Sequence, residues 1–198
     1  MRILLAEDQA MVRGALAALL SLETDYQIDQ ACDGDQAVAQ LQQQQYDLLL
    51  TDIEMPGLTG IELAQWCQQH APATKVVVLT TFGRAGYIKR AIDLGVGGFL
   101  LKDAPSDSLI QAINQVMQGK RVIDPELAIS AMGEQDPLND KERKALRLAS
   151  DGKTTAEIAQ TLFIAEGTVR NYLSEAIAKL HATNRIDAAR IAKQKGWL

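Results

Sequence analysis

Hydrophobic positions in the first 118 residues alternate between short apolar runs and longer stretches with helical spacing. The short runs predict five strands: Arg2–Ala6, Gln27–Ala31, Asp47–Thr51, Lys75–Thr80 and Gly98–Leu101. The longer stretches predict five helices: Gln9–Leu22, Asp35–Gln44, Gly60–Gln69, Gly86–Leu94 and Ser106–Gln118. This alternation indicates parallel βα units, and the runs LLLT and VVVLT are typical of strands covered on both faces. We therefore predict a doubly wound α/β domain with a five-stranded parallel sheet.

The pattern changes after residue 118. Residues 119–137 mix glycine, proline and charge around a short apolar patch, which predicts a linker with a helical turn near Glu126–Met132. From residue 138 no strand pattern remains, and helical spacing predicts an all-α unit of four helices: Lys141–Ser150, Thr155–Leu162, Glu166–Leu180 and Ile186–Lys195. The predicted domains are therefore 1–118 and 138–198, with the linker 119–137 between them.

The charge of the chain follows the same division. Residues 1–137 hold 9 Lys/Arg and 18 Asp/Glu, whereas residues 138–198 hold 11 and 7, so the net charges are −9 and +4. A basic final unit favours nucleic acid as its partner, although chance scatter alone could also produce +4. No stretch approaches the roughly 18 apolar residues of a membrane helix, so we expect no membrane insertion. Two lone cysteines and the lack of a signal peptide predict a cytoplasmic protein.

Acidic residues follow two of the predicted strands. Glu7 and Asp8 come directly after the first strand, and Asp52 comes after the third. These strands are neighbours in a doubly wound sheet, so their carboxyl ends bring the three carboxylates together. Such a cluster repels itself unless a cation neutralises it, and oxygen ligands of this kind suit Mg²⁺. One acid at a strand end is ordinarily a solvated loop residue, but three acids on adjacent strand ends favour a metal site.

Two further strand ends complete a set suited to a phosphoryl group. Thr80 ends the fourth strand with a hydroxyl, and Lys102 follows the fifth strand with an ammonium. Each residue alone reads as an ordinary strand-end or surface residue. Together with the carboxylates they supply an acceptor, a metal site, a hydroxyl and a cation.

Residues 1–118 resemble the response-regulator receiver domain over their whole length, through LLAEDQ, LLLTDIEMPGLTG, VVVLTTF and GFLLKD. The resemblance implies a flavodoxin-like fold for this domain, and it implies that Asp52 accepts a phosphoryl group from a sensor histidine kinase. It also implies that Asp8, Asp52 and the backbone carbonyl of Glu54 bind Mg²⁺, with Glu7 contributing through water.

The same resemblance assigns three residues to the response. Thr80 would turn toward the phosphoryl group, and Lys102 would pair with it. Phe99 matches an aromatic switch position that is often tyrosine in the family, and it lacks the hydroxyl; a plain core aromatic is the alternative. The first and fifth helices are frequent dimer faces in this family, so phosphorylation is expected to produce a homodimer. The apolar stripe of Ser106–Gln118 permits such a face without requiring it.

The predicted helix Glu166–Leu180 has an apolar face and a small polar face, which suits the DNA major groove or merely solvent. Residues 138–198 resemble the LuxR-type helix-turn-helix domain of NarL/FixJ regulators, through LNDKERKALRLASDGKTTAEIA, GTVRNYLSEAIAKL and ATNRIDAARIA. The resemblance implies that this helix reads DNA and that two residues hold phosphates. The implied base-facing residues are Thr168, Arg170, Asn171 and Ser174, and the phosphate contacts are Lys179 and Arg185.

Together, the two resemblances imply a response regulator that is not an enzyme and that binds promoter DNA after phosphorylation. The run TTFGRAGY, the segment TVRNYLSEAIAKL and the GWL terminus resemble DesR-like regulators, which implies control of membrane lipids as one output. Two alternatives stay open. One is a Mg²⁺-dependent enzyme with Asp52 as nucleophile, and the other is a phosphorylation-independent DNA-binding regulator whose receiver serves only as a dimer module.

Overall fold

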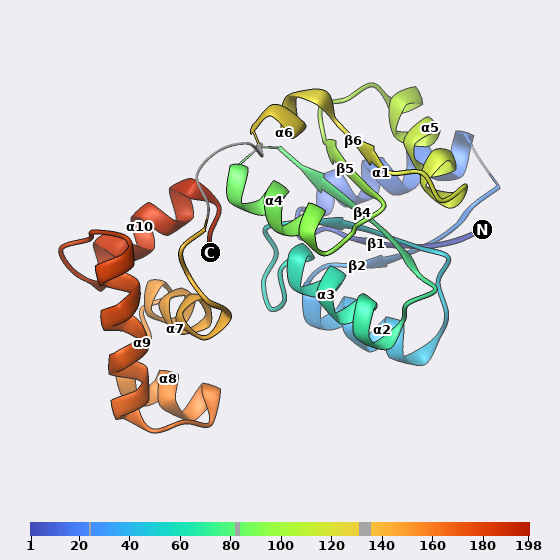
Figure 1. Ribbon diagram of the computed structural model, residues 1–198. Helices are drawn as coiled ribbons and strands as arrows, with labels where there is room; N and C mark the ends of the chain where they lie inside the picture. The colour runs from blue at the N-terminus through green and yellow to red at the C-terminus, as the bar shows by residue number, and fades with distance from the viewer. Residues whose placement is uncertain (24, 82–83, 131–135) are drawn as a thin grey trace. The chain divides into compact units, whose positions relative to one another are not determined.

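The computed structural model describes residues 1–23, 25–81, 84–130 and 136–198. The chain divides into two compact units, one built around a β-sheet and the other around the last four helices (Figure 1). Residues 82 and 83 of the TTFGRAGY run, and residues 131–135 of the predicted linker, lie outside the described residues.

The first unit contains a parallel sheet with strand order β2-β1-β3-β4-β5-β6. Its strands are β1 (Arg2–Ala6), β2 (Gln27–Ala31), β3 (Leu48–Asp52), β4 (Lys75–Thr80), β5 (Gly98–Leu101) and β6 (Val122–Ile123). The helices between and after them are α1 (Ala10–Glu23), α2 (Gly34–Gln43), α3 (Gly60–His70), α4 (Ala85–Asp93), α5 (Ser106–Met117) and α6 (Pro125–Ser130). The predicted doubly wound parallel fold is therefore confirmed.

The prediction of five strands is one strand short, because β6 pairs with β5 inside the segment predicted as a linker. Two residues are too few to produce a period-two pattern, so the sequence offers no sign of this strand. The next residues form α6, close to the predicted helical turn. The third strand is also displaced by one residue, since it ends on Asp52.

Alternation along the strands sends apolar side chains to both faces of the sheet. Ile3 and Leu5 of β1 pack with α1 and α5, whereas Leu4 and Ala6 pack with the helices α2, α3 and α4. Figure 1 shows these two layers of helices on opposite sides of the sheet. Covering both faces explains why β1, β3 and β4 are almost wholly apolar.

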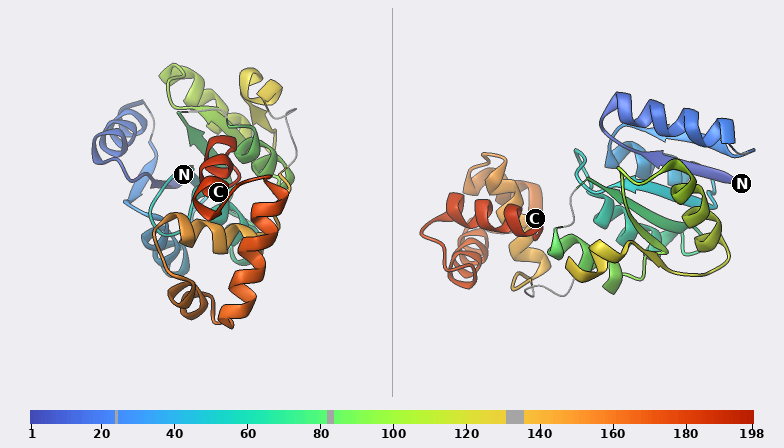
Figure 2. Two further views of the ribbon diagram at one scale, coloured as in Figure 1. Left: turned by 90° about the vertical axis from the view of Figure 1, so that its left-hand side faces the viewer. Right: turned by 90° about the horizontal axis from the view of Figure 1, so that it is seen from above.

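The second unit consists of α7 (Asp140–Ser150), α8 (Thr155–Leu162), α9 (Glu166–Lys179) and α10 (Arg185–Lys195). Its core is formed by apolar residues from all four helices, together with Trp197 and Leu198. Helices α7 and α9 pack against each other, and the left view of Figure 2 shows them side by side. The predicted four-helix unit is confirmed, and each helix begins and ends within one residue of its predicted bounds.

The helix starts of the second unit are capped by their own sequence. Asn139 and Glu142 form a capping box at α7, and Thr154 and Glu157 form another at α8. By contrast, α9 has Ala165 at its N-cap and no side-chain cap. Among the described residues, no helix is long and apolar enough to span a membrane.

Candidate functional site

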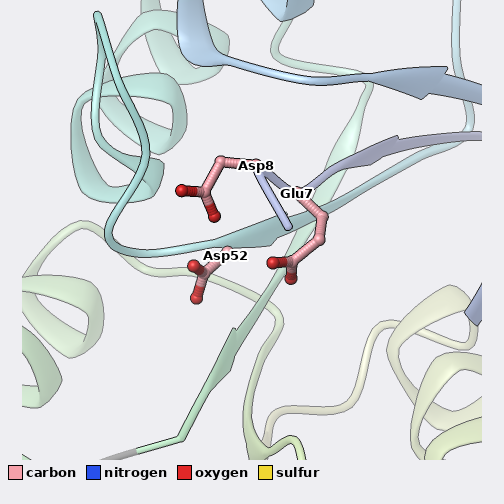
Figure 3. Close-up of side chains that lie close together, drawn as sticks. All are labelled: Glu7, Asp8 and Asp52. Carbon is pink, nitrogen blue, oxygen red and sulfur yellow. The ribbon is translucent and has the colours of Figure 1, made fainter. Parts of the chain in front are cut away.

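Three carboxylates meet at the carboxyl edge of the sheet. Glu7 and Asp8 follow β1, and Asp52 is the last residue of β3, paired in register with Leu79 of β4. One oxygen from each of the three lies within 4.8 Å of the others. Figure 3 shows the three side chains gathered at one place. The sequence-based expectation that adjacent strand ends bring these acids together is confirmed.

The backbone around Asp52 is held by its neighbours. The hydroxyl of Thr51 donates to the carbonyl oxygen of Asp52 at 2.9 Å. The start of α3 approaches the same carbonyl so closely that a Cβ on Gly60 would lie 2.0 Å from its oxygen. Only glycine allows this approach, which fixes the end of β3 beneath α3.

A buried lysine lies beside two of the three acids. Lys102, directly after β5, has its Nζ atom 2.7 Å from Oε2 of Glu7 and 3.0 Å from Oδ1 of Asp52. All three side chains are at most 8% exposed, so water screens these contacts poorly. The resemblance implied a pairing of Lys102 with the phosphoryl group; in this structure the ammonium pairs with the two acids.

Burial controls the ionisation of this cluster. Loss of water around the carboxylate raises the pKa of Asp52 to about 6, although the charge of Lys102 acts in the opposite direction. Burial disfavours the Lys102 ammonium, but hydrogen bonding to Glu7 and the charge of Asp52 outweigh it and raise its pKa. At neutral pH the cluster therefore holds an ionised, poorly solvated Asp52 beside a firmly protonated lysine.

The other predicted receiver residues lie around this cluster. Thr80 ends β4 and is buried, and its carbonyl oxygen accepts the amide of Lys102 at 2.8 Å. Phe99 on β5 is fully buried in the core. The side chain of Glu54 lies at the surface and accepts a hydrogen bond from Tyr87 of α4 at 3.2 Å.

Arg13 is a residue that the sequence analysis missed. Its Nη1 atom donates to the carbonyl oxygens of Glu7 at 2.6 Å and of Asp8 at 3.3 Å. An arginine of α1 thus fixes the loop that presents two of the three acids. An arginine in the first turns of a helix carries no sequence signal for such a contact.

The donor set fits Mg²⁺. Three carboxylates and one ammonium leave a formal charge of about −2, and carboxylate oxygens are the ligands that Mg²⁺ prefers. Among the described residues, the ammonium of Lys102 is the one polar partner of Oε2 of Glu7, which is buried. A divalent cation beside these oxygens would relieve their repulsion.

The predicted base-facing residues lie on the outer side of α9. Arg170, Asn171 and Ser174 are exposed and Thr168 is partly exposed, whereas the opposite side packs into the core. The guanidinium of Arg170 pairs with Glu166 one turn earlier, at 2.9 Å. This contact is at the surface and is expected to contribute little, so the guanidinium can exchange it for another acceptor.

The two predicted phosphate contacts differ from each other. Arg185 is partly exposed at the start of α10. Lys179 has its Nζ atom 2.8 Å from both carboxylate oxygens of Glu142, a residue of α7 that is 3% exposed. This ion pair joins α9 to α7, and the charge of Lys179 is thereby balanced by an acid of the same unit.

Comparison with known proteins agrees with both halves of this description. Residues 3–114 match the model of the response regulator receiver domain, and residues 136–192 match that of bacterial regulatory proteins of the luxR family. This chain belongs to the response regulators that join a receiver domain to a LuxR-type DNA-binding domain. As a member of that family it is a phosphorylation-responsive transcriptional regulator that binds DNA.

Relatives of this response regulator match it from end to end. The transcriptional regulatory protein DesR of Bacillus subtilis is 48% identical over 98% of both chains. The regulatory protein YvfU of the same organism is 46% identical over 100% of this chain and 99% of its own. The structure of RcsB from Salmonella enterica serovar Typhimurium, bound to a promoter with a phosphomimetic, has a TM-score of 0.74 at 25% identity over 98% of both chains. The resemblance to DesR-like regulators is therefore confirmed, and control of membrane lipids stays a prediction.

Proposed function

We propose that Asp52 is the residue on which this response regulator is phosphorylated. The observation that carries the proposal is the convergence of Glu7, Asp8, Asp52 and Lys102 at one edge of the sheet. An oxygen of Asp52 attacks the phosphorus of a phosphohistidine on a sensor histidine kinase. The P–N bond breaks, the histidine nitrogen takes its electron pair, and an acyl phosphate forms on Asp52.

The residues around Asp52 have separate roles in this transfer. Burial leaves the ionised carboxylate poorly solvated, which favours its attack. Glu7, Asp8 and Asp52, with the carbonyl of Glu54, would hold Mg²⁺, which when bound neutralises charge on the phosphoryl oxygens. The ammonium of Lys102 already contacts the carboxylate of Asp52, so it can stay paired with the negative charge when that charge moves onto the phosphoryl oxygens.

Phosphorylation changes the charge at this edge. A phosphoryl group adds roughly two negative charges and three acceptor oxygens beside Lys102 and Thr80. The proposed response is that Thr80 turns toward the phosphate and Phe99 changes its rotamer. The loops after β4 and β5 then favour a homodimer that binds two DNA half-sites.

Within the DNA-binding unit, we propose that Thr168, Arg170, Asn171 and Ser174 face the bases, because the core does not use their side of α9. Arg185 is the better placed of the two predicted phosphate contacts. A phosphate contact from Lys179 would take the cation away from the buried carboxylate of Glu142, which is costly.

The phosphorylation site can be tested by intact-protein mass spectrometry with acetyl phosphate as the donor. We expect one added phosphoryl group in the presence of Mg²⁺, little in EDTA, and none in Asp52→Asn. The matched control is Asp93→Asn, a surface acid of α4, which should be phosphorylated like the wild type. Undiminished labelling of Asp52→Asn would disprove the assignment. Continuous release of phosphate with many turnovers would instead favour the Mg²⁺-dependent enzyme.

DNA binding can be tested by fluorescence anisotropy on duplexes selected in vitro from a random pool. Affinity should fall as salt rises. Arg170→Ala should weaken binding by about 1–3 kcal/mol if its guanidinium reads a base. The control is Arg190→Ala, an exposed arginine of α10.

Sedimentation velocity before and after phosphorylation tests the proposed dimer. A shift from monomer to dimer that accompanies tighter DNA binding supports the proposal. The phosphorylation-independent alternative predicts one unchanged species and one unchanged affinity.

A further inference from the structure

A cavity of about 370 Å³ lies at the amino-terminal edge of the receiver sheet, the edge opposite to Asp52. It is bounded by the end of α3, the start of β4, the loop between α4 and β5, and the end of α5. Its volume is at the small end of the range of ligand-binding pockets, roughly 300–1,000 Å³.

Three cationic side chains line this cavity: Lys75, Lys120 and Arg121. Among the described residues, none of the three side chains makes an ion pair or a hydrogen bond, and no aspartate or glutamate lines the cavity. By contrast, Arg2 and Arg143 are each paired with an acid elsewhere in the chain. These three unpaired cations lie around one cavity although residues 1–137 carry a net charge of −9.

The sixth strand helps to build this wall. Pairing of Val122 with Gly98, the first residue of β5, places Arg121 at the start of that strand, beside the cavity. The guanidinium packs over Gly95, because a Cβ on that glycine would lie 3.1 Å from Nη2. Gly95 has a positive φ of 71°, so a larger residue is disfavoured there for two reasons.

Cations at this edge have a second physical explanation. The carboxyl ends of α3 and α5 lie here, and lysine or arginine near a helix C-terminus is stabilised by the helix dipole. The dipole explains exposed cations at helix ends, but not a concave surface between them. The rest of the wall combines the polar residues Gln68 and Thr74 and three glycines with apolar residues of α3, β4, α5 and the adjoining loops: Ala64, Cys67, Pro72, Val76, Leu94, Val96 and Val116.

We propose that this cavity binds a small organic anion, with at least two negative charges on phosphate or carboxylate groups and a compact apolar body. The cations would hold the charged groups, and the apolar residues of the wall would hold the body. Both the cations and the wall belong to the receiver unit and lie away from Asp52. Binding should therefore not depend on phosphorylation of Asp52.

The test is a ¹H–¹⁵N NMR titration of the full chain in EDTA with three probes: phenyl phosphate, inorganic phosphate and phenol. Phenyl phosphate should shift the amides of Gly95, Gly97, Lys120 and Arg121 saturably. It should bind about tenfold more tightly than phosphate or phenol, a difference of about 1.4 kcal/mol. Residue-resolved shifts separate this cavity from the basic DNA-binding unit.

Variants decide whether the cations carry the binding. Lys120→Gln with Arg121→Gln should lose at least about tenfold in affinity for phenyl phosphate, and Lys75→Gln alone should lose less. All three side chains are exposed, so the fold should be kept, and the same spectra report it. Lys89→Gln, a surface lysine of α4 outside the cavity, and Asp52→Asn should bind like the wild type. The proposal is overturned by an absence of saturable shifts at these amides, by undiminished binding in the double variant, or by loss of binding in Asp52→Asn.

Discussion

Asp52 is expected to destabilise the folded receiver at neutral pH, in the absence of Mg²⁺, because its charge is buried. The residue is 7% exposed, and burial raises the pKa of its carboxyl from 3.8 to about 6 despite the neighbouring Lys102. An acid whose pKa is higher in the folded state binds more protons when folded. The free energy of unfolding therefore falls as pH rises from about 4 to about 6. One pKa unit corresponds to about 1.4 kcal/mol, so the full penalty above pH 6 is about 3 kcal/mol.

Replacing Asp52 by asparagine keeps the shape of the side chain and removes this penalty. We expect Asp52→Asn to exceed the wild type in free energy of unfolding by up to about 3 kcal/mol at pH 7.5, and by about 2 kcal/mol less at pH 4.5. The pKa of about 6 already includes the attraction of Lys102, so the change between the two pH values needs no separate allowance for that contact. Lys102 retains Glu7 as a partner in the variant.

The assay is urea denaturation in EDTA, followed through the backbone amide signals of β3 and β4, which report on the receiver alone. Asp93→Asn is the control, because an acid with a 62% exposed side chain should change stability by less than about 0.5 kcal/mol at either pH. The reasoning is refuted if the difference between Asp52→Asn and the wild type is the same at pH 4.5 and pH 7.5. It is also refuted if that difference decreases as pH rises.

Three further changes follow from single contacts or backbone angles. Lys102→Met leaves Glu7 and Asp52 buried without a cation, so it should lower the free energy of unfolding by about 3–5 kcal/mol at pH 7.5 in the same urea titration. A loss below about 1 kcal/mol would contradict the stabilising role of the lysine beside these two acids. Ala165→Ser supplies a side-chain cap at the extended N-cap position of α9 and should stabilise the DNA-binding unit by about 1 kcal/mol, measured by thermal unfolding. If stability does not rise, another group already caps the helix. Phe163→Gly should stabilise the DNA-binding unit by up to about 1 kcal/mol, because Phe163 has a φ of 55° and is 94% exposed. Destabilisation would show that the phenyl ring makes a contact that offsets the backbone strain.

Most of the element positions could be predicted because they depend on local patterns. Strands β1, β2, β4 and β5 coincide with their predicted bounds, since apolar runs of four to six residues between helical stretches have few other readings. The short strand β6 could not be predicted, because its pairing depends on the edge that β5 offers and not on its own two residues.

The candidate site, too, could be predicted from the sequence only in part. The identity of the clustered acids followed from strand order, because parallel strands bring their carboxyl ends to one edge. The structure alone places Arg13 on the carbonyls of Glu7 and Asp8, and Lys179 on Glu142, because such contacts depend on side-chain reach across packed elements.

By itself, the sequence determined that this protein has a receiver with its acids at strand ends and a separate helical unit for DNA, because hydrophobic periodicity and residue order are local properties. Only the tertiary structure decided which of those charges are paired and how deeply they are buried. Lys102 is 95 residues from Glu7 and 50 from Asp52, and the packing of the sheet brings its ammonium within 3.0 Å of both. The raised pKa of Asp52 and the unpaired cations of the opposite edge follow from that packing, since burial and charge separation exist only once the chain is folded.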